Sequence, residues 1–85
     1  MTLTLTDVRR IASDVAQQEH PALEVVGVTP REGSTTSAEV ILIVRDREDQ
    51  PGPMVIGVSR QTSEIECRGA VRTRLQERLS TRTAH

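Results

Sequence analysis

Few residues in this chain combine a reactive type with the neighbours that catalysis requires. Cys67 is the single cysteine, and Arg68 beside it is a residue that lowers the pKa of an exposed thiol. Nucleophilic catalysis also needs a base that serves the nucleophile, and no signature places one of the serines or threonines beside His20. Because Cys67 falls on the apolar side of a predicted helix, we expect a small buried core residue. A single cysteine also excludes an internal disulfide and a zinc cluster.

The acidic residues offer one candidate cation site. Asp46, Glu48 and Asp49 carry the oxygen ligands that hard cations take, although a solvated charged loop is the favoured interpretation of the same residues. His20 and His85 have no partners at metal-ligand spacing, and no glycine-rich phosphate loop is present. We therefore predict no catalytic residue, no metal and no cofactor, and expect a protein that is not an enzyme.

The composition predicts one small domain, residues 1–85, with an aliphatic core. Hydrophobic residues make up 35% of the 85 residues, and none is aromatic. Small domains bury a modest fraction of their surface, and aromatic side chains would have supplied much of it, so self-association would restore buried area. No apolar stretch has membrane-spanning length and no signal-peptide pattern is present, so we expect a cytoplasmic protein without a membrane partner. All eleven cationic residues are arginine, which is typical of a GC-rich bacterial genome.

Two segments have helical periodicity. Apolar residues at helical spacing predict a helix over 4–19, with Thr4 as N-cap, Asp7 completing a capping box and Pro21 ending the helix. The alternation in residues 2–5 leaves a short strand open as the alternative for residues 1–6. A second helix is predicted over 63–80, where Ser63 and Glu66 have capping-box spacing. Its apolar stripe consists of Ile65, Cys67, Ala70, Val71, Leu75 and Leu79.

Three strands are predicted between the helices, over 23–29, 38–45 and 54–59, each separated from the next by a polar loop rich in turn residues. Short loops favour two successive antiparallel hairpins. Each helix has one apolar stripe, so both should pack on the same side of the sheet. The predicted fold class is α+β, a two-layer α-β-β-β-α arrangement with a three-stranded antiparallel sheet and two helices on one face.

The second strand is apolar on both of its faces, although helices would cover only one. Strict alternation of side chains assigns a further apolar set to the uncovered face of the sheet. That set consists of Val26, Val28, Ile41, Ile43 and Val55. A dry centre with charges at its margins is typical of an interface. We therefore predict an interaction domain that docks through this face, either as a homodimer or against another protein.

An uneven charge distribution favours a second hypothesis. Residues 1–59 hold five arginines and nine acidic residues, a net charge of −4, whereas residues 60–85 hold six arginines and three glutamates, a net charge of +3. Such asymmetry can mark a nucleic-acid face, although a solvated cationic helix explains it as well. The alternative function is an RNA- or ribosome-binding module that uses Arg60, Arg68, Arg72, Arg74 and Arg78.

The α-β-β-β-α order resembles the double-stranded-RNA-binding domain over residues 4–79. Gly57 matches the glycine of that family's third strand, Thr62 falls at its small polar position, and residues 69–71 fall on its alanine run. Ser63 and Glu64 stand where the family has the lysines that grip phosphates. The resemblance implies the shape of that domain, and the acidic replacement opposes RNA binding, so nucleic acid is a possible but not a favoured partner.

Overall fold

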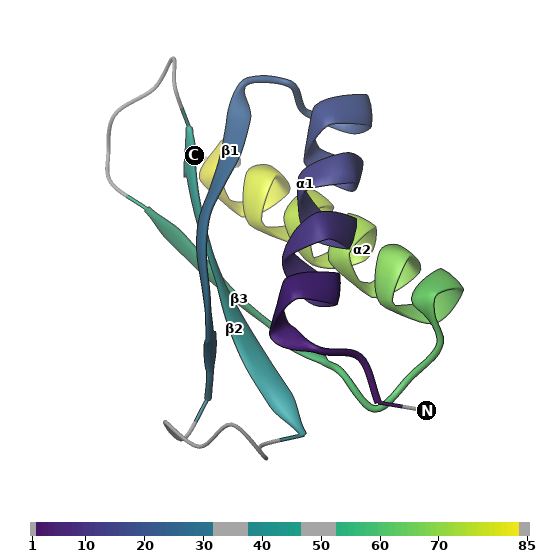
Figure 1. Cartoon of the computed structure of the whole chain (residues 1–85). Coiled ribbons are helices and arrows are strands. Elements are labelled where there is room, and N and C mark those ends of the chain that lie inside the picture. The colour runs from purple at the N-terminus through teal and green to yellow at the C-terminus, as the bar shows by residue number, and fades with distance from the viewer. Residues whose placement is uncertain (1, 32–37, 47–52, 84–85) are drawn as a thin grey trace.

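A computed structural model of the chain describes residues 2–31, 38–46 and 53–83, with side chains up to Ser80. The elements, in chain order, are α1 (Leu5–Glu19), β1 (Leu23–Pro30), β2 (Glu39–Asp46), β3 (Met54–Ser59) and α2 (Glu64–Thr83) (Figure 1). The predicted α-β-β-β-α order is therefore confirmed, and no boundary lies more than three residues from its predicted position.

The first helix begins where its capping residues predict. The Asp7 N–H donates to the Thr4 hydroxyl (3.0 Å), and the Thr4 N–H donates to the Asp7 carboxylate (3.1 Å). These two bonds satisfy backbone groups that a helix start leaves without partners. Residues 2–4 form no strand, so the alternative for the N-terminal segment is wrong. Instead, the Leu3 N–H donates to the Arg60 carbonyl (2.8 Å), which ties this segment to the end of β3.

The three strands form one antiparallel sheet in the order β1-β2-β3. Both helices lie on the same side of this sheet, with α1 over β1 and α2 over β3 (Figure 1). The core between the layers is entirely aliphatic apart from Met54 and Cys67. Its most deeply buried side chains are Ile11, Leu42, Leu75, Val8, Val15, Val40, Val44, Val71 and Cys67.

A β-bulge interrupts the alternation of side chains along β1. Val25 lies opposite Val44, but Gly27 lies opposite Ile43, so Val26 is an additional residue in the strand. A one-residue slip moves every later side chain to the other face of the sheet. Val28 consequently lies opposite Leu42 and packs against the core. The prediction that placed Val28 on the uncovered face was wrong, because it assumed unbroken alternation.

The apolar stripe of α2 is narrower than predicted. Cys67, Val71 and Leu75 are fully buried, but Ile65 is 84% exposed. At 100° per residue, Ile65 lies about 120° around the helix from Val71, which turns it away from the sheet. At the start of α2 the Glu66 N–H donates to the Ser63 hydroxyl (3.2 Å) as predicted. The Glu66 carboxylate, however, accepts a hydrogen bond from the Thr62 hydroxyl (2.5 Å).

Candidate interaction surface

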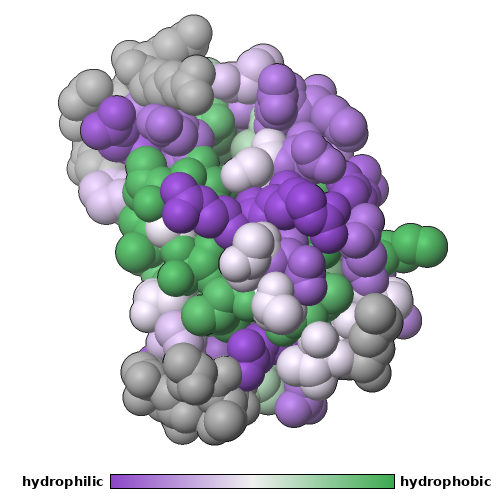
Figure 2. Space-filling view, viewed as in Figure 1, coloured by the Kyte–Doolittle hydropathy of each residue, from purple (hydrophilic) through white to green (hydrophobic). Residues whose placement is uncertain are grey.

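The side of the sheet that faces away from both helices, called the outer face below, has an apolar centre. Gly27, Ile43 and Val55 lie opposite one another across the three strands, and the bulged Val26 lies beside Gly27. Val26 is 43% exposed and Val55 is 46% exposed. Ile41 and Ile43, in the central strand, are half-buried. Hydrophobic surface gathers over the strands in the space-filling view (Figure 2).

An ion pair lies at each end of this apolar centre. Glu24 and Arg45 pair across β1 and β2 at one end, with 3.7 Å between carboxylate and guanidinium. Arg31 and Glu39 pair at the other end, at 3.4 Å. All four side chains are partly exposed, so each pair contributes no more than about 1 kcal/mol to stability. What the pairs provide is a charged margin around an apolar centre.

Arg31 also extends across the sheet to β3. A Cβ atom placed on Gly57 would lie 3.1 Å from Nη1 of Arg31, so the guanidinium covers the position where a side chain would stand. Sequence reasoning did not single out Arg31. The available signal was Gly57 itself, because glycine inside a strand often marks the close approach of another group.

Four of the five arginines proposed for nucleic-acid binding separate into two groups on α2. Arg68 and Arg72 turn toward α1, where they join a row of ion pairs between the helices. The pairs are Arg10–Glu64 (2.9 Å), Arg68–Asp14 (3.6 Å) and Arg72–Glu19. The hydrogen bond and the charge of Arg10 hold the pKa of Glu64 below its ordinary value. This side of α2 therefore presents arginines whose charge is already balanced by carboxylates.

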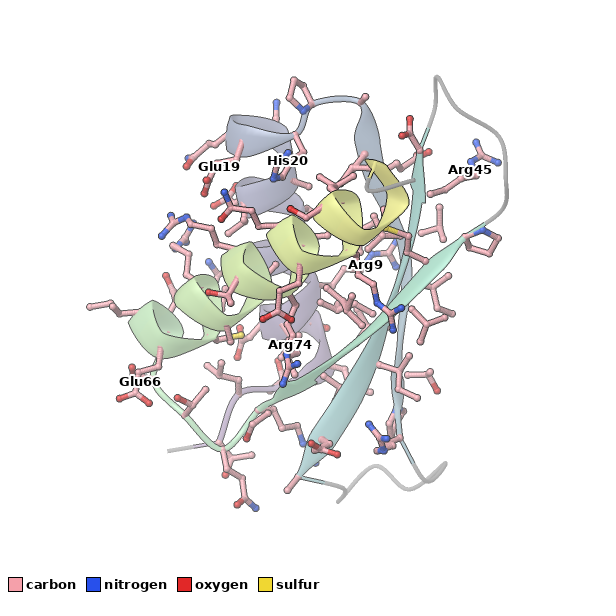
Figure 3. The ribbon with its side chains drawn as sticks, turned by 180° about the vertical axis from the view of Figure 1, so that it is seen from behind. Arg9, Glu19, His20, Arg45, Glu66 and Arg74 are labelled. Carbon is pink, nitrogen blue, oxygen red and sulfur yellow. The ribbon has the colours of Figure 1, made fainter. Side chains whose placement is uncertain are left out.

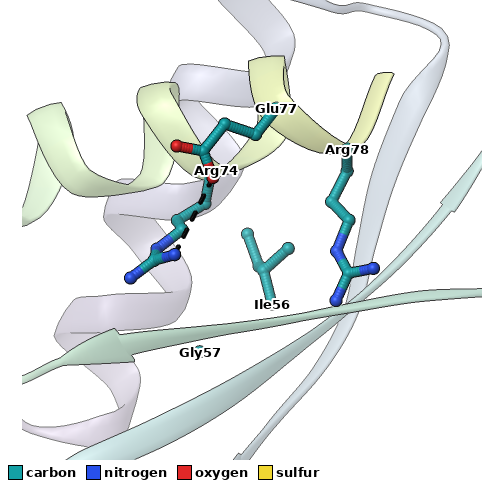
Figure 4. Close-up of a pocket in the computed structure, with 5 residues that line it drawn as sticks. All are labelled: Ile56, Gly57, Arg74, Glu77 and Arg78. Carbon is teal, nitrogen blue, oxygen red and sulfur yellow. Dashed lines mark ion pairs between the residues drawn. The ribbon is translucent and has the colours of Figure 1, made fainter. Parts of the chain in front are cut away.

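Arg74 and Arg78 lie on the side of α2 that faces β3. Figure 3 shows Arg74 pointing to the strands. Glu19, the partner of Arg72, lies at the C-terminal end of α1. Together with Glu77, Ile56 and Gly57, the two arginines line a depression of about 240 Å³ beside β3 (Figure 4). Arg74 pairs with Glu77 at 3.8 Å. No residue in the described part of the chain forms an ion pair with Arg78.

Arg60 occupies a third place, at the end of β3. Its N–H donates to the Ala38 carbonyl (2.9 Å), and its carbonyl accepts from the Leu3 N–H. The backbone of Arg60 thus joins the sheet to the N-terminal segment. On α2, Arg68 and Arg72 are separated from Arg74 and Arg78, which lie on the side that faces β3.

The single thiol is in the core. Cys67 is fully buried, and this burial raises the pKa of its thiol, against a smaller opposing effect of Arg68. Burial was predicted from the apolar stripe and is confirmed. A nucleophile needs the thiolate and access for a substrate, and this environment disfavours both.

Metal-ligating side chains do not gather in the part of the chain that the structure describes. Within residues 2–31, 38–46 and 53–83, no group of three or more His, Cys, Asp or Glu side chains could hold an ion. Asp46 ends β2, while Glu48, Asp49 and His85 lie outside the described residues. Neither described helix is long and apolar enough to cross a membrane.

Comparison of the chain with protein-family models, with curated proteins and with solved structures found no match.

Proposed function

We propose that this chain is a small protein-docking domain that associates with a second copy of itself through the outer face. The observation that supports this most directly is the apolar row of Val26, Ile43 and Val55, which lies on the side opposite both helices. Soluble domains usually cover such a row or use it in an interface.

A second copy suits the charges at the margin of the outer face. Among the residues that the structure describes, each end of the face carries one arginine and one glutamate, Arg45 with Glu24 and Arg31 with Glu39. A symmetric dimer brings a surface patch against itself, so every charge meets a charge from the same set. Whichever ends meet, an arginine can approach a glutamate of the other copy, and like-charge contact can be avoided.

The exposed fractions predict a weak dimer. Complete burial of a valine side chain is worth about 1.5–3 kcal/mol, so burying the exposed portion of Val26 or Val55 yields roughly 1 kcal/mol each. Four such valines and four half-buried isoleucines together yield roughly 8 kcal/mol, from which the loss of translational and rotational freedom removes about 4 kcal/mol or more. The remaining free energy of about 4 kcal/mol corresponds to association at protein concentrations of about 1 mM.

Sedimentation equilibrium from micromolar to about 1 mM protein tests this proposal. Wild-type protein should show a reversible monomer–dimer equilibrium, and Val55→Asp and Ile43→Asp should shift it to the monomer because each places a charge in the apolar row. Ile65→Asp is the matched control, since Ile65 is a more exposed apolar residue on α2, away from the outer face. A wild-type monomer at the highest concentration, or equal dissociation in the control, would contradict the proposal. Val55→Asp replaces an exposed residue and serves as the decisive variant if Ile43→Asp fails to fold.

A further inference from the structure

The two edges of the sheet differ in how they resist pairing with another strand. Natural edge strands commonly carry bulges, prolines or charged side chains that block such pairing. The β1 edge has a bulge at Val26 and ends at Pro30, which has no N–H to donate. The β3 edge, Met54–Ser59, contains no bulge, proline or charged residue. By these criteria β3 is the edge that remains open to another strand.

The register identifies which backbone groups of β3 point outward. The Arg60 N–H donates to the Ala38 carbonyl (2.9 Å), and residues along an antiparallel strand alternate between facing the neighbouring strand and facing away. Residues 54, 56 and 58 therefore face β2, whereas Val55, Gly57 and Ser59 face the open edge. Among the described residues, none hydrogen-bonds to the outward N–H or C=O groups of Val55 and Gly57. These outward groups are available to form backbone hydrogen bonds with an added strand.

Guanidinium groups lie near Gly57 on both faces of the sheet. Arg74 and Arg78 approach from the helix side, where they line the depression with Gly57 (Figure 4). Arg31 approaches from the outer face, with Nη1 3.1 Å from the position of a Gly57 Cβ. Among the described residues, the carboxylates that pair with these arginines are Glu77, 3.8 Å from Arg74, and Glu39, 3.4 Å from Arg31. Within this described set, three arginines and two carboxylates leave a positive charge at the edge.

We propose that the β3 edge binds an extended acidic segment of another protein, which adds as a fourth strand. Successive side chains of a strand point to opposite faces of the sheet, so consecutive acidic residues would meet Arg31 on one face and Arg74 and Arg78 on the other. Backbone hydrogen bonds to Val55 and Gly57 supply the remaining contacts. A second copy is a poorer occupant of this edge, because pairing β3 with β3 would bring two positively charged sets together.

The binding test uses two synthetic peptides as probes. One fluorescein-labelled ten-residue peptide is built of valine, threonine and glutamate with adjacent glutamates at its centre, and the other has lysine in place of every glutamate. Fluorescence anisotropy of the full chain should show saturable binding of the glutamate peptide that weakens with added salt, and no binding of the lysine peptide. Absence of glutamate-peptide binding at about 1 mM protein, or equal binding of both peptides, would overturn the proposal.

Two variants separate the backbone contacts from the charges. Val55→Pro removes an outward N–H, leaves the hydrogen bonds to β2 in place and adds no atoms at Gly57 beside Arg31, whereas Arg78→Glu reverses the charge beside the edge. The proline variant should weaken glutamate-peptide binding roughly five-fold, the value of one backbone hydrogen bond, and Arg78→Glu about ten-fold or more, the value of one charge-assisted hydrogen bond. Arg9→Glu is the matched control, because Arg9 is exposed on α1 and has no ion-pair partner among the described residues; it should change affinity less than two-fold.

Amide resonances locate the bound peptide. The N–H groups of Val55 and Gly57 should exchange more slowly with solvent when the glutamate peptide is bound, while those of the β1 edge are unchanged. If Val55→Pro fails to fold, this measurement with Arg78→Glu decides the question. Protection at β1 instead of β3, or unchanged binding in Arg78→Glu, would refute pairing at this edge. So would protection of the same amides by a second copy of the chain without peptide.

Discussion

Two aspartate substitutions two residues apart in β1 should have opposite consequences because of the bulge. Val28 packs against the core opposite Leu42, whereas Val26 is 43% exposed on the outer face. With unbroken alternation both valines would face the same side, and both substitutions would be tolerated alike. The pair therefore tests the register shift itself.

The magnitudes follow from the burial of each valine. Val28→Asp loses about 1 kcal/mol of apolar burial and places a carboxylate against the aliphatic core at about 1–3 kcal/mol more, a total of roughly 2–4 kcal/mol. Val26→Asp leaves its charge in water and should cost less than about 1 kcal/mol. Since a domain of this size has only about 4–13 kcal/mol of stability, Val28→Asp removes a large part of it.

Urea unfolding followed by circular dichroism gives the free energy of unfolding of each aspartate variant. The protein concentration is a few micromolar, so that the monomer is measured. Val26→Asn and Val28→Asn are the matched controls of similar shape without the charge. The reasoning is refuted if the two aspartate variants are equally stable, or if Val26→Asp is the less stable one. A change in the slope of the free energy against urea concentration would show that the compactness of the native or denatured state had changed as well.

The remaining predictions concern the helix start, the buried thiol and nucleic acid. The pKa of Asp7 is lowered from its ordinary value of 3.8, mainly by the hydrogen bond from the Thr4 backbone N–H. The contribution of Asp7 to stability is therefore fully present above pH 3.8 and is lost as the pH falls through the lower pKa of the folded state. Thr4→Ala keeps that backbone N–H and removes only the hydroxyl, the second cause, so the pKa of Asp7 should rise part of the way toward 3.8 in an NMR titration; loss of the cap should cost about 1 kcal/mol in urea unfolding, and an unchanged stability would contradict the capping role. Cys67 should react with iodoacetamide only after denaturation, because it is fully buried; rapid alkylation of the folded protein would revive a catalytic role. A gel-shift assay at low salt should show no RNA binding, because carboxylates on α1 pair with Arg68 and Arg72 and Glu77 pairs with Arg74; a salt-sensitive shift that Arg78→Glu abolishes would support the nucleic-acid alternative.

Local signals in the sequence predicted the elements well. Thr4 with Asp7 located the start of α1, and the position of Pro21 located its end, because caps and prolines act on backbone groups within one helical turn. Polar loops separated the three strands, and their shortness favoured the antiparallel order that the sheet has. These signals act over a few residues, so one sequence is enough to interpret them.

The errors arose where position depends on another element. Val28 was assigned to the outer face by counting along the strand, but a bulge depends on how β1 pairs with β2. Ile65 fitted the helical period loosely, and the direction from which the sheet approaches α2 excludes it from the core. The arginines of α2 likewise divide into a group that faces α1 and a group that faces β3. This division depends on how the helix packs, which a count of charges along the chain does not reveal.

Isotope-filtered NMR tests the self-association proposal most directly. The sample is an equimolar mixture of labelled and unlabelled protein at a concentration near 1 mM, where a weak dimer is populated. We predict intermolecular contacts between the methyl groups of Val26, Ile43 and Val55. Absence of intermolecular contacts at that concentration, or contacts that involve Ile65 and leave the outer face unaffected, would contradict it.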